Sequence, residues 1–339
     1  MSRLLIVHAA GPGMSIQDAG RPGYLGFGLS RGGAADMQAL AEGAALLQQD
    51  AGLAALELAG MGGRFEVTQD TRIALAGAPM RASIDGAPLA WNASHLLPAG
   101  SHLDIGGATR GVYGYLHLGG GLDVTRHLGA RSAHLAAGIG GLVEAGAALP
   151  VGTDMTGGET GLTLPEDPRF DGGEVRVLTG FQTGFFPDDE IARFEATQFS
   201  RDARGNRMGV RMVPEGAGFA SAAGLSVLSE VIVPGDIQIT GDGTPFVLLA
   251  ECQTTGGYPR IGSVLPCDLP RVAQAAPGAR LRFRFVTPEE GMRIARAAAA
   301  TRTGLRSTLR PLVRDPHDIR DLLSYQLIDG VTAGHDQED

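Results

Sequence analysis

The residue types best suited to chemistry occur together in one stretch, Ala250–Ile261, directly after an apolar run, Pro245–Leu249, that is typical of a buried strand. The stretch offers neutral hydrogen-bond donors and acceptors, a pair of glycines that lets a ligand approach the backbone, and one aromatic ring. These residues are Gln253, Thr254, Thr255, Gly256, Gly257 and Tyr258. They suit a polar, uncharged group such as an amide or a ureido ring. A hairpin turn whose polar residues face water would explain the same composition.

A second polar, glycine-rich loop lies near the N-terminus, over Ser15–Tyr24 and Gly26–Gly33. No regular element tolerates this much glycine, so we expect an ordered loop that either faces solvent or is functional. Gln17 and Asp18 are candidates for ligand contact, although Asp18 could instead pair with Arg21, three residues further on.

Two acidic residues lie where structure alone could explain them. Asp36 precedes an amphipathic pattern that predicts a helix to about Gln49, and it would be the N-cap of that helix. Glu57 lies between apolar neighbours in the expected strand Ala54–Leu58, where an acidic residue is often paired or turned to the outer face.

Metal and nucleophile chemistry receive little support from the spacing of the residues. The histidines from His95 onward match no metal-ligand spacing, so we expect structural histidines and no metal site; they are His95, His102, His117, His127 and His134. Cys252 would need an orienting histidine that the sequence does not assign, and a buried strand cysteine is the commoner case. The sequence also lacks the G-x-S-x-G, H-E-x-x-H and C-x-x-C motifs.

The composition excludes several classes of protein. With 339 residues and a net charge of −9, the chain can bury a sizeable core but has no basic patch, so we expect no nucleic-acid binding. No apolar run is long enough to span a membrane, and Met1–Val7 predicts a strand rather than a signal peptide. Sparse cysteines favour a cytoplasmic protein. All 28 basic residues are arginine, which excludes Schiff-base, phosphate-binding and biotin-carrying lysines.

The elements that must position these residues are mostly short strands separated by glycine-rich turns, which predicts a mainly β fold. Strands are expected over 64–67, 72–76, 81–84, 102–105, 113–118 and 174–178, with a hairpin turn at Asp85–Gly86. A segment of low periodicity, 151–173, predicts a boundary between two related, barrel-like β units. Short helices are expected over 188–194, 290–300 and 319–328, and disorder over 335–339.

Five motifs occur in an order that resembles the biotin-dependent carboxyltransferase family: Ser15–Tyr24, Gly33–Asp36, Asn206–Gly209, Ser229–Gln238 and Gln253–Pro259. This family is also called allophanate hydrolase subunit 2. It includes KipA, the C subunit of bacterial 5-oxoprolinase and the carboxyltransferase part of urea carboxylase. The resemblance covers roughly residues 5–290 and implies two cyclophilin-like β-barrel domains with a C-terminal helical tail. The expected divisions are 1–160, 161–290 and 291–339, with a site in the cleft between the barrels.

The resemblance implies three alternative functions. In the 5-oxoprolinase branch, the chain would act with a KipI-like protein and a lactam-hydrolysing subunit, and the complex would use ATP to open a lactam. In the urea carboxylase branch, it would move a carboxyl group from carboxybiotin to an amide nitrogen. Biotin would then arrive on a separate carrier, because no biotin is expected to be attached covalently here, and a biotin carboxylase would use the ATP. A KipA-like member would instead bind a partner that inhibits a kinase, without catalysis.

The resemblance also implies which residues line the cleft. Gln253 would help to hold the ureido or lactam oxygen, either Asp36 or Glu57 could serve as a base, and Arg260 would attract a carboxylate. The substrate-binding set implied by the motifs is Gln17, Asp18, Arg207, Thr254, Thr255, Gly256, Gly257, Tyr258 and Arg260. Many relatives carry lysine where Arg260 stands, so a charge role transfers to this position more readily than a proton-donating role.

Overall fold

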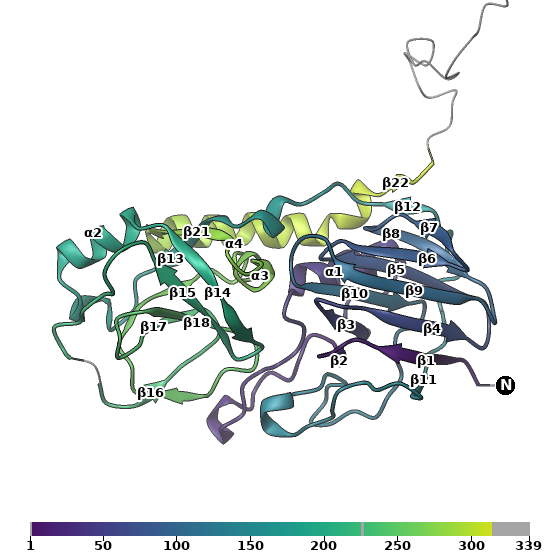
Figure 1. Cartoon of the computed structure of the whole chain (residues 1–339), viewed down its shortest axis with the longest axis horizontal. Coiled ribbons are helices and arrows are strands. Elements are labelled where there is room, and N and C mark those ends of the chain that lie inside the picture. The colour runs from purple at the N-terminus through teal and green to yellow at the C-terminus, as the bar shows by residue number, and fades with distance from the viewer. Residues whose placement is uncertain (1, 225–226, 314–339) are drawn as a thin grey trace, which may run out of the picture.

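The computed structural model describes residues 2–224 and 227–313, which form two β-rich units connected along one side by a long helix (Figure 1). The first unit has a six-stranded sheet in the order β11-β1-β4-β9-β6-β7 and a seven-stranded sheet in the order β2-β3-β10-β5-β8-β12-β22. Its strands are β1 Leu4–Ala10, β2 Ser15–Gln17, β3 Ala55–Ala59, β4 Gly63–Val67, β5 Thr71–Gly77, β6 Met80–Ile84, β7 Ala87–Leu89, β8 Ala93–Leu97, β9 His102–Ala108, β10 Tyr113–Leu118, β11 Ala148–Pro150, β12 Leu162–Thr163 and β22 Arg310–Pro311.

The core of the first unit lies between its two sheets. Alternate residues of each strand point inward, so that Leu5 and Phe65 of one sheet meet Leu75 and Leu116 of the other, and all four are fully buried. Removing these apolar side chains from water is the main favourable term that holds the sheets together.

The second unit is a closed barrel with the strand order β13-β20-β17-β18-β15-β14-β21. The strands are β13 Gly173–Leu178, β14 Phe199–Asn206, β15 Gly209–Pro214, β17 Asp236–Ile239, β18 Pro245–Leu248, β20 Arg260–Val264 and β21 Arg280–Val286. A small ribbon of β16 Glu230–Val231 and β19 Thr255–Gly256 stands beside the barrel (Figure 1). In the core, the ring of Phe194 lies 5.1 to 5.2 Å from the rings of three other phenylalanines, Phe199, Phe219 and Phe283.

Helices and single turns connect and cover the two units. The helices are α1 Met37–Leu46, α2 Asp188–Ala196, α3 Leu269–Gln274 and α4 Pro288–Thr303, and the 3-10 turns are η1 Leu25–Phe27, η2 Leu135–Ala137, η3 Pro168–Asp171, η4 Thr183–Phe185 and η5 Leu305–Thr308. Helix α4 contacts β13 of the barrel as well as α1 and η5 on the first unit. Because β22 then pairs with β12, the described chain ends on the first unit.

The structure confirms most of the local predictions. All the strands named from the sequence are present, and Asp85 and Gly86 take positive φ angles of 48° and 86° in the turn between β6 and β7. The Asp36 carboxylate accepts hydrogen bonds from the amides of Gln38 and Ala39, both at 2.9 Å, as an N-cap does. The helix that it caps ends at Leu46, three residues before the expected end at Gln49.

The larger divisions of the chain are less simple than the sequence suggested. The boundaries at residues 160 and 290 stay predictions, although β12, which lies after the first of them, pairs with β8 of the first unit. The second unit closes into a barrel, whereas the strands of the first divide into two sheets. The predicted helix over 319–328 and the predicted disorder over 335–339 lie outside the described residues.

Replacing Gly43 with alanine tests how tightly α1 packs on β10. In an exposed helix this change adds about 1 kcal/mol of stability, because alanine is the better helix former. Here a Cβ at Gly43 would lie 2.0 Å from Cδ2 of the buried His117, so we expect a loss of about 1–3 kcal/mol in urea unfolding. In a His117→Ala background the same change should be neutral or stabilising. Stabilisation of the otherwise native chain by Gly43→Ala would contradict this packing.

The same histidine should make the fold sensitive to mild acid. Burial lowers the pKa of His117 to about 4, from an ordinary value of 6.5. The unfolded chain therefore binds more protons between these values, so the stability is complete above pH 6.5 and falls as the pH drops towards 4. We expect His117→Leu to reduce the difference in unfolding free energy between pH 7.5 and pH 5. If this difference in unfolding free energy is unchanged in His117→Leu, His117 is not the cause of the pH dependence of stability.

Candidate functional site

The two units meet around one buried arginine, Arg207, which lies in the turn between β14 and β15 of the barrel. Its guanidinium donates to Glu57 of the first unit, to the Gly33 carbonyl oxygen, and to Glu251 of its own unit, where Nε and Oε1 are 2.5 Å apart. Although burial disfavours the charge, Glu57 and Glu251 raise the pKa of Arg207, so it stays protonated. This arginine therefore connects the two units by a buried ionic network.

Glu57 has no oxygen available to a ligand. One oxygen pairs with Arg207, and the other accepts from the Tyr115 hydroxyl at 2.6 Å and from the Ala35 amide at 2.8 Å. The side chain is fully buried. A base must lie within hydrogen-bond reach of the proton that it removes, and both oxygens of Glu57 are taken up by contacts within the protein, so the structure does not support its expected role as a base.

The carboxylate of Asp36 is likewise occupied by hydrogen bonds within the protein. Besides capping α1, it accepts from Nε of Arg169 and Nε2 of Gln274, both at 2.8 Å, and it is fully buried. Gln274, from α3, also bonds the backbone at the start of β10, with its Oε1 2.9 Å from the amides of Val112 and Tyr113. The second expected base is therefore also a residue that joins the two units.

Arg169 completes this second network, just before the chain enters the barrel. It forms a two-pronged contact with Glu42 of α1, with N–O distances of 2.8 and 2.6 Å. Burial opposes the charge, but Asp36 and Glu42 raise the pKa of Arg169 above its ordinary value.

The stretch Ala250–Ile261 is partly open to solvent, as both the ligand-binding and the hairpin-turn interpretations require. Gln253 and Thr255 are exposed and Tyr258 is 45 % exposed, while Thr254 and both glycines are half-buried. A Cβ at Gly256 would lie 2.5 Å from Nε2 of Gln238, so close packing accounts for this glycine. The exposed residues remain available for a ligand, and their roles stay predictions.

The contacts of Arg260 differ from those expected of an arginine that attracts a substrate carboxylate. Its guanidinium contacts Glu230 and lies 3.2 Å from Asp236, and its Nη1 also donates to the Val231 carbonyl oxygen at 2.8 Å. Two carboxylates of its own unit already balance its charge, so the structure does not support Arg260 as the group that attracts a substrate carboxylate.

Gln17 and Asp18 hold the N-terminal loop in place. Gln17 is fully buried and donates to Ser15 at 2.9 Å, whereas Asp18 accepts from the amides of Gly20 and Arg131 at 2.8 and 2.6 Å. The suggested pair of Asp18 with Arg21 is wrong, because Arg21 donates to the carbonyl oxygens of His127 and Ser132 instead.

A cavity of about 520 Å³ lies beside the Arg207 network, where the two units face each other. Tyr113 and Arg201, which line it, were not singled out from the sequence, because only the burial of the strands shows where their side chains go. Burial, and then the nearby Glu57, raise the pKa of Tyr113 to about 12, so its hydroxyl stays protonated at neutral pH. The residues that line the cavity are Gly13, Ala59, Gly60, Ala108, Gly111, Val112, Tyr113, Leu135, Arg201, Ala203, Gly205, Asn206, Arg207 and Pro277.

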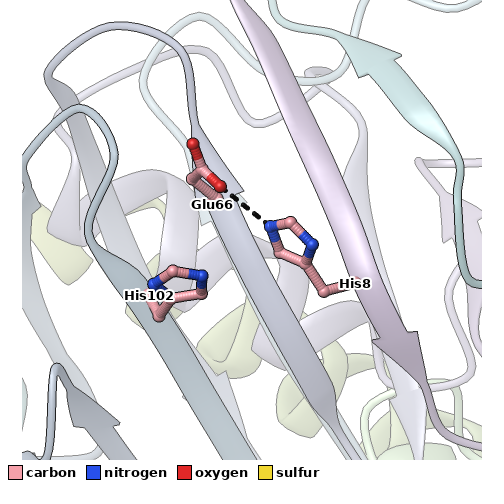
Figure 2. A group of neighbouring side chains, drawn as sticks. All are labelled: His8, Glu66 and His102. Carbon is pink, nitrogen blue, oxygen red and sulfur yellow. Dashed lines mark hydrogen bonds and ion pairs between the residues drawn. The ribbon is translucent and has the colours of Figure 1, made fainter.

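One cluster outside the interface has donors of the kind that bind metals. His8, Glu66 and His102 project from the neighbouring strands β1, β4 and β9, and their possible ligand atoms lie within 4.8 Å of one another (Figure 2). The sequence did not group them because Glu66 and His102 face each other across a strand pair, while the register shift after Val7 turns His8 towards them. A 2.9 Å hydrogen bond from His8 to Glu66 explains the contact without an ion.

Two further histidines of the described chain are held by hydrogen bonds. His95 bonds the Ala90 carbonyl oxygen at 2.8 Å, and His134 bonds Ser30 at 2.9 Å and accepts from the Ala137 amide. Cys252 is buried, and burial raises the pKa of its thiol to about 12, so a thiolate nucleophile is not favoured at this position.

The family model described as "Carboxyltransferase domain, subdomain A and B" matches residues 27–285. The chain belongs to this carboxyltransferase family. The match begins in η1 and ends in β21, so it spans the interface between the two units, while α4 lies outside it.

Two bacterial relatives match more than four fifths of the chain. The chain is 31 % identical over 295 residues to the C subunit of 5-oxoprolinase from Escherichia coli (strain K12), and the match covers 86 % of this chain and 94 % of the relative. The protein of the same name from Haemophilus influenzae is 31 % identical over 287 residues, with 83 % and 91 % covered. The resemblance derived from the motifs is thereby confirmed, and the relatives are subunits of an enzyme.

Larger fungal proteins contain a similar region. Urea amidolyase of Saccharomyces cerevisiae is 24 % identical over 291 residues, but the match covers only 16 % of it and 79 % of this chain. The crystal structure of Kluyveromyces lactis urea carboxylase has the same fold over 92 % of this chain and 31 % of its own, with a TM-score of 0.79 at 22 % identity.

Within the described part of this carboxyltransferase-family chain, no helix is long and apolar enough to cross a membrane.

Breaking the Arg207 network should destabilise the whole chain. Arg207→Met leaves Glu57 and Glu251 buried without a counter-charge, so we expect urea unfolding to show a loss of about 3–5 kcal/mol. The control is Arg204→Met, which removes a pair between Asp202 and an arginine that is 76 % exposed, and should cost about 1 kcal/mol or less. Equal effects of the two substitutions would contradict the structural role of Arg207.

Proposed function

We propose that this chain is the C-type subunit of a 5-oxoprolinase-like complex, and that the cavity between its two units holds a small amide or lactam. The observation that carries the proposal is the long match with proteins named as the C subunit of 5-oxoprolinase, which covers 94 % of the Escherichia coli relative and 86 % of this chain. Other subunits would supply the ATP-dependent chemistry, since the chain has none of the lysine that a P-loop needs.

The residues of the site suit the recognition of a neutral amide. Opening a lactam adds water across the ring carbonyl and nitrogen, so negative charge develops on the carbonyl oxygen before the carbon–nitrogen bond breaks. The family motifs give the contact with that oxygen to the exposed Gln253 and to the backbone of the half-buried Gly256 and Gly257. None of these three residues is among those that line the cavity, so this contact rests on the motifs alone. The two buried carboxylates, Asp36 and Glu57, would hold the units in position rather than take up protons.

A second candidate follows from the fungal relatives. Proteins named urea amidolyase and urea carboxylase contain a similar region, which supports a biotin-dependent transfer of a carboxyl group to an amide nitrogen. In that case biotin would arrive on a carrier chain with its own carboxylase, because this chain has no lysine for biotin attachment.

Purification under mild native conditions, followed by assays of the recovered complex, separates these functions. The proposal predicts recovery of a KipI-like protein and a lactam-hydrolysing subunit, with ATP-dependent conversion of 5-oxoproline to glutamate that avidin does not inhibit. Recovery of a biotinylated carrier with avidin-sensitive turnover would support the second candidate. Partner binding without any turnover would contradict both candidates and favour a regulatory role.

Within the assembled complex, Gln253→Ala should lower turnover about tenfold or more, because a side-chain donor that stabilises developing negative charge is lost. The matched control is Gln198→Ala, a half-buried glutamine in the short segment between α2 and β14, which should leave turnover unchanged. Both variants are compared by steady-state kinetics at saturating ATP. Equal turnover in the two variants would contradict the role of the Gln253 side chain in stabilising the developing negative charge.

A further inference from the structure

Arg201, on β14, is a buried cation without a visible partner. The residue is 6 % exposed and lines the cavity between the units. Among residues 2–224 and 227–313, no group accepts a hydrogen bond from its guanidinium, and its Nε is buried without a partner. Burial disfavours the charge, and Tyr113 and Asp202 offset this cost only in part and without a hydrogen bond, which is unusual in a folded protein.

The other buried arginines of the described chain have acceptors of the kind that Arg201 lacks. Arg72 contacts Asp154, Arg169 contacts Asp36 and Glu42, and Arg207 contacts Glu57 and Glu251, while Arg21 donates to two carbonyl oxygens. Arg201 differs from all four. Each of the other four has at least one acceptor among the described residues, although Nη1 of Arg21 is buried without one, whereas the guanidinium of Arg201 has none and faces a cavity.

Asp202 and the two carboxylates of the Arg207 network are already engaged by other arginines. Asp202, next in sequence, accepts from Nη2 of Arg204 at 2.9 Å and lies 3.9 Å from Arg211. Glu57 and Glu251, across the cavity wall, are held by Arg207. Burial accordingly lowers the pKa of Arg201, the reverse of the effect on Arg207, although an arginine remains protonated at neutral pH.

The local backbone places this guanidinium at the cavity. The register of β14 against β15 shifts between Arg201 and Gly205, which is the kind of bulge that re-aims a side chain beside a binding site. Gly205 makes room for the group, because a Cβ there would lie 2.7 Å from Nη2 of Arg201. Tyr113 lines the same cavity with a hydroxyl that remains a donor, and the other walls include the apolar residues Val112 and Pro277.

We infer that Arg201 binds the carboxylate of a small anionic ligand in the cavity between the units, with the Tyr113 hydroxyl as a second donor. A guanidinium matches a carboxylate with two parallel hydrogen bonds, and the apolar walls would cover the rest of the molecule. Arg201 thus takes the role that the sequence gave to Arg260. The identity of the ligand rests on the proposed function, which points to 5-oxoprolinate, a five-membered lactam with one carboxylate.

Equilibrium binding to the full-length chain tests the inference. The probes are sodium 5-oxoprolinate and 2-pyrrolidinone, which has the same lactam ring without the carboxylate. We expect the native chain to prefer 5-oxoprolinate by about tenfold or more, as the loss of a charge-assisted hydrogen bond implies. Arg201→Gln should abolish this preference, Arg201→Lys should retain part of it, and Arg280→Gln, which changes an exposed arginine on the adjacent strand β21, should retain all of it.

A stability measurement separates binding from a structural role. Because Arg201 has no partner in the described structure, Arg201→Gln should unfold at the same urea concentration as the native chain or at a higher one. A lowered midpoint, an unchanged preference in Arg201→Gln, or no binding of 5-oxoprolinate by the native chain would each overturn the inference. Loss of the preference without ring opening by any assembled complex would leave the carboxylate site standing and refute the proposed function. Ring opening by the assembled complex, with an unaltered preference in Arg201→Gln, would support the proposed function and refute the carboxylate site at Arg201.

Discussion

The arrangement of the molecule depends on the buried contact of Arg207 with Glu57 and Glu251. One guanidinium is shared by two carboxylates from different units, and none of the three residues is more than 7 % exposed. The desolvation cost of such a group is offset only where the geometry and the remaining hydrogen bonds are complete, and here Tyr115, Ala35 and Gly33 complete them. The interface is therefore specific, because sliding one unit against the other would leave buried charges unpaired.

This constraint explains why several residues expected to act on a substrate are absent from the open surface. Asp36 and Glu57 connect one unit to the other, and the charge of Arg260 is balanced by Glu230 and Asp236 of its own unit. The same constraint fixes the cavity beside them, since its walls come from both units. In such an arrangement the ligand-binding groups are those that the interface leaves unsatisfied, and Arg201 is the clearest of them.

The sequence was most informative where the physical cause is local. The cap at Asp36, the turn at Asp85–Gly86 and the alternation within single strands depend on neighbouring residues, and the structure has all three. The partners of Arg207 could not be predicted, because Glu57 lies 150 positions away and their contact depends on how the units dock. The burial of Arg201 depends on the closure of the barrel and the approach of the first unit, and no short sequence pattern records either. The order of the motifs indicated the family, but it did not separate residues that bind from residues that support.

The most direct test of the account is a crystal structure of this chain, in its native complex, with 5-oxoprolinate bound. The account predicts the ligand in the cavity between the two units, with its carboxylate on the Arg201 guanidinium and the Arg207 network intact beside it. A ligand bound to the outer surface of either unit, with the cavity between them empty, would contradict the claim that the docking of the two units creates the site.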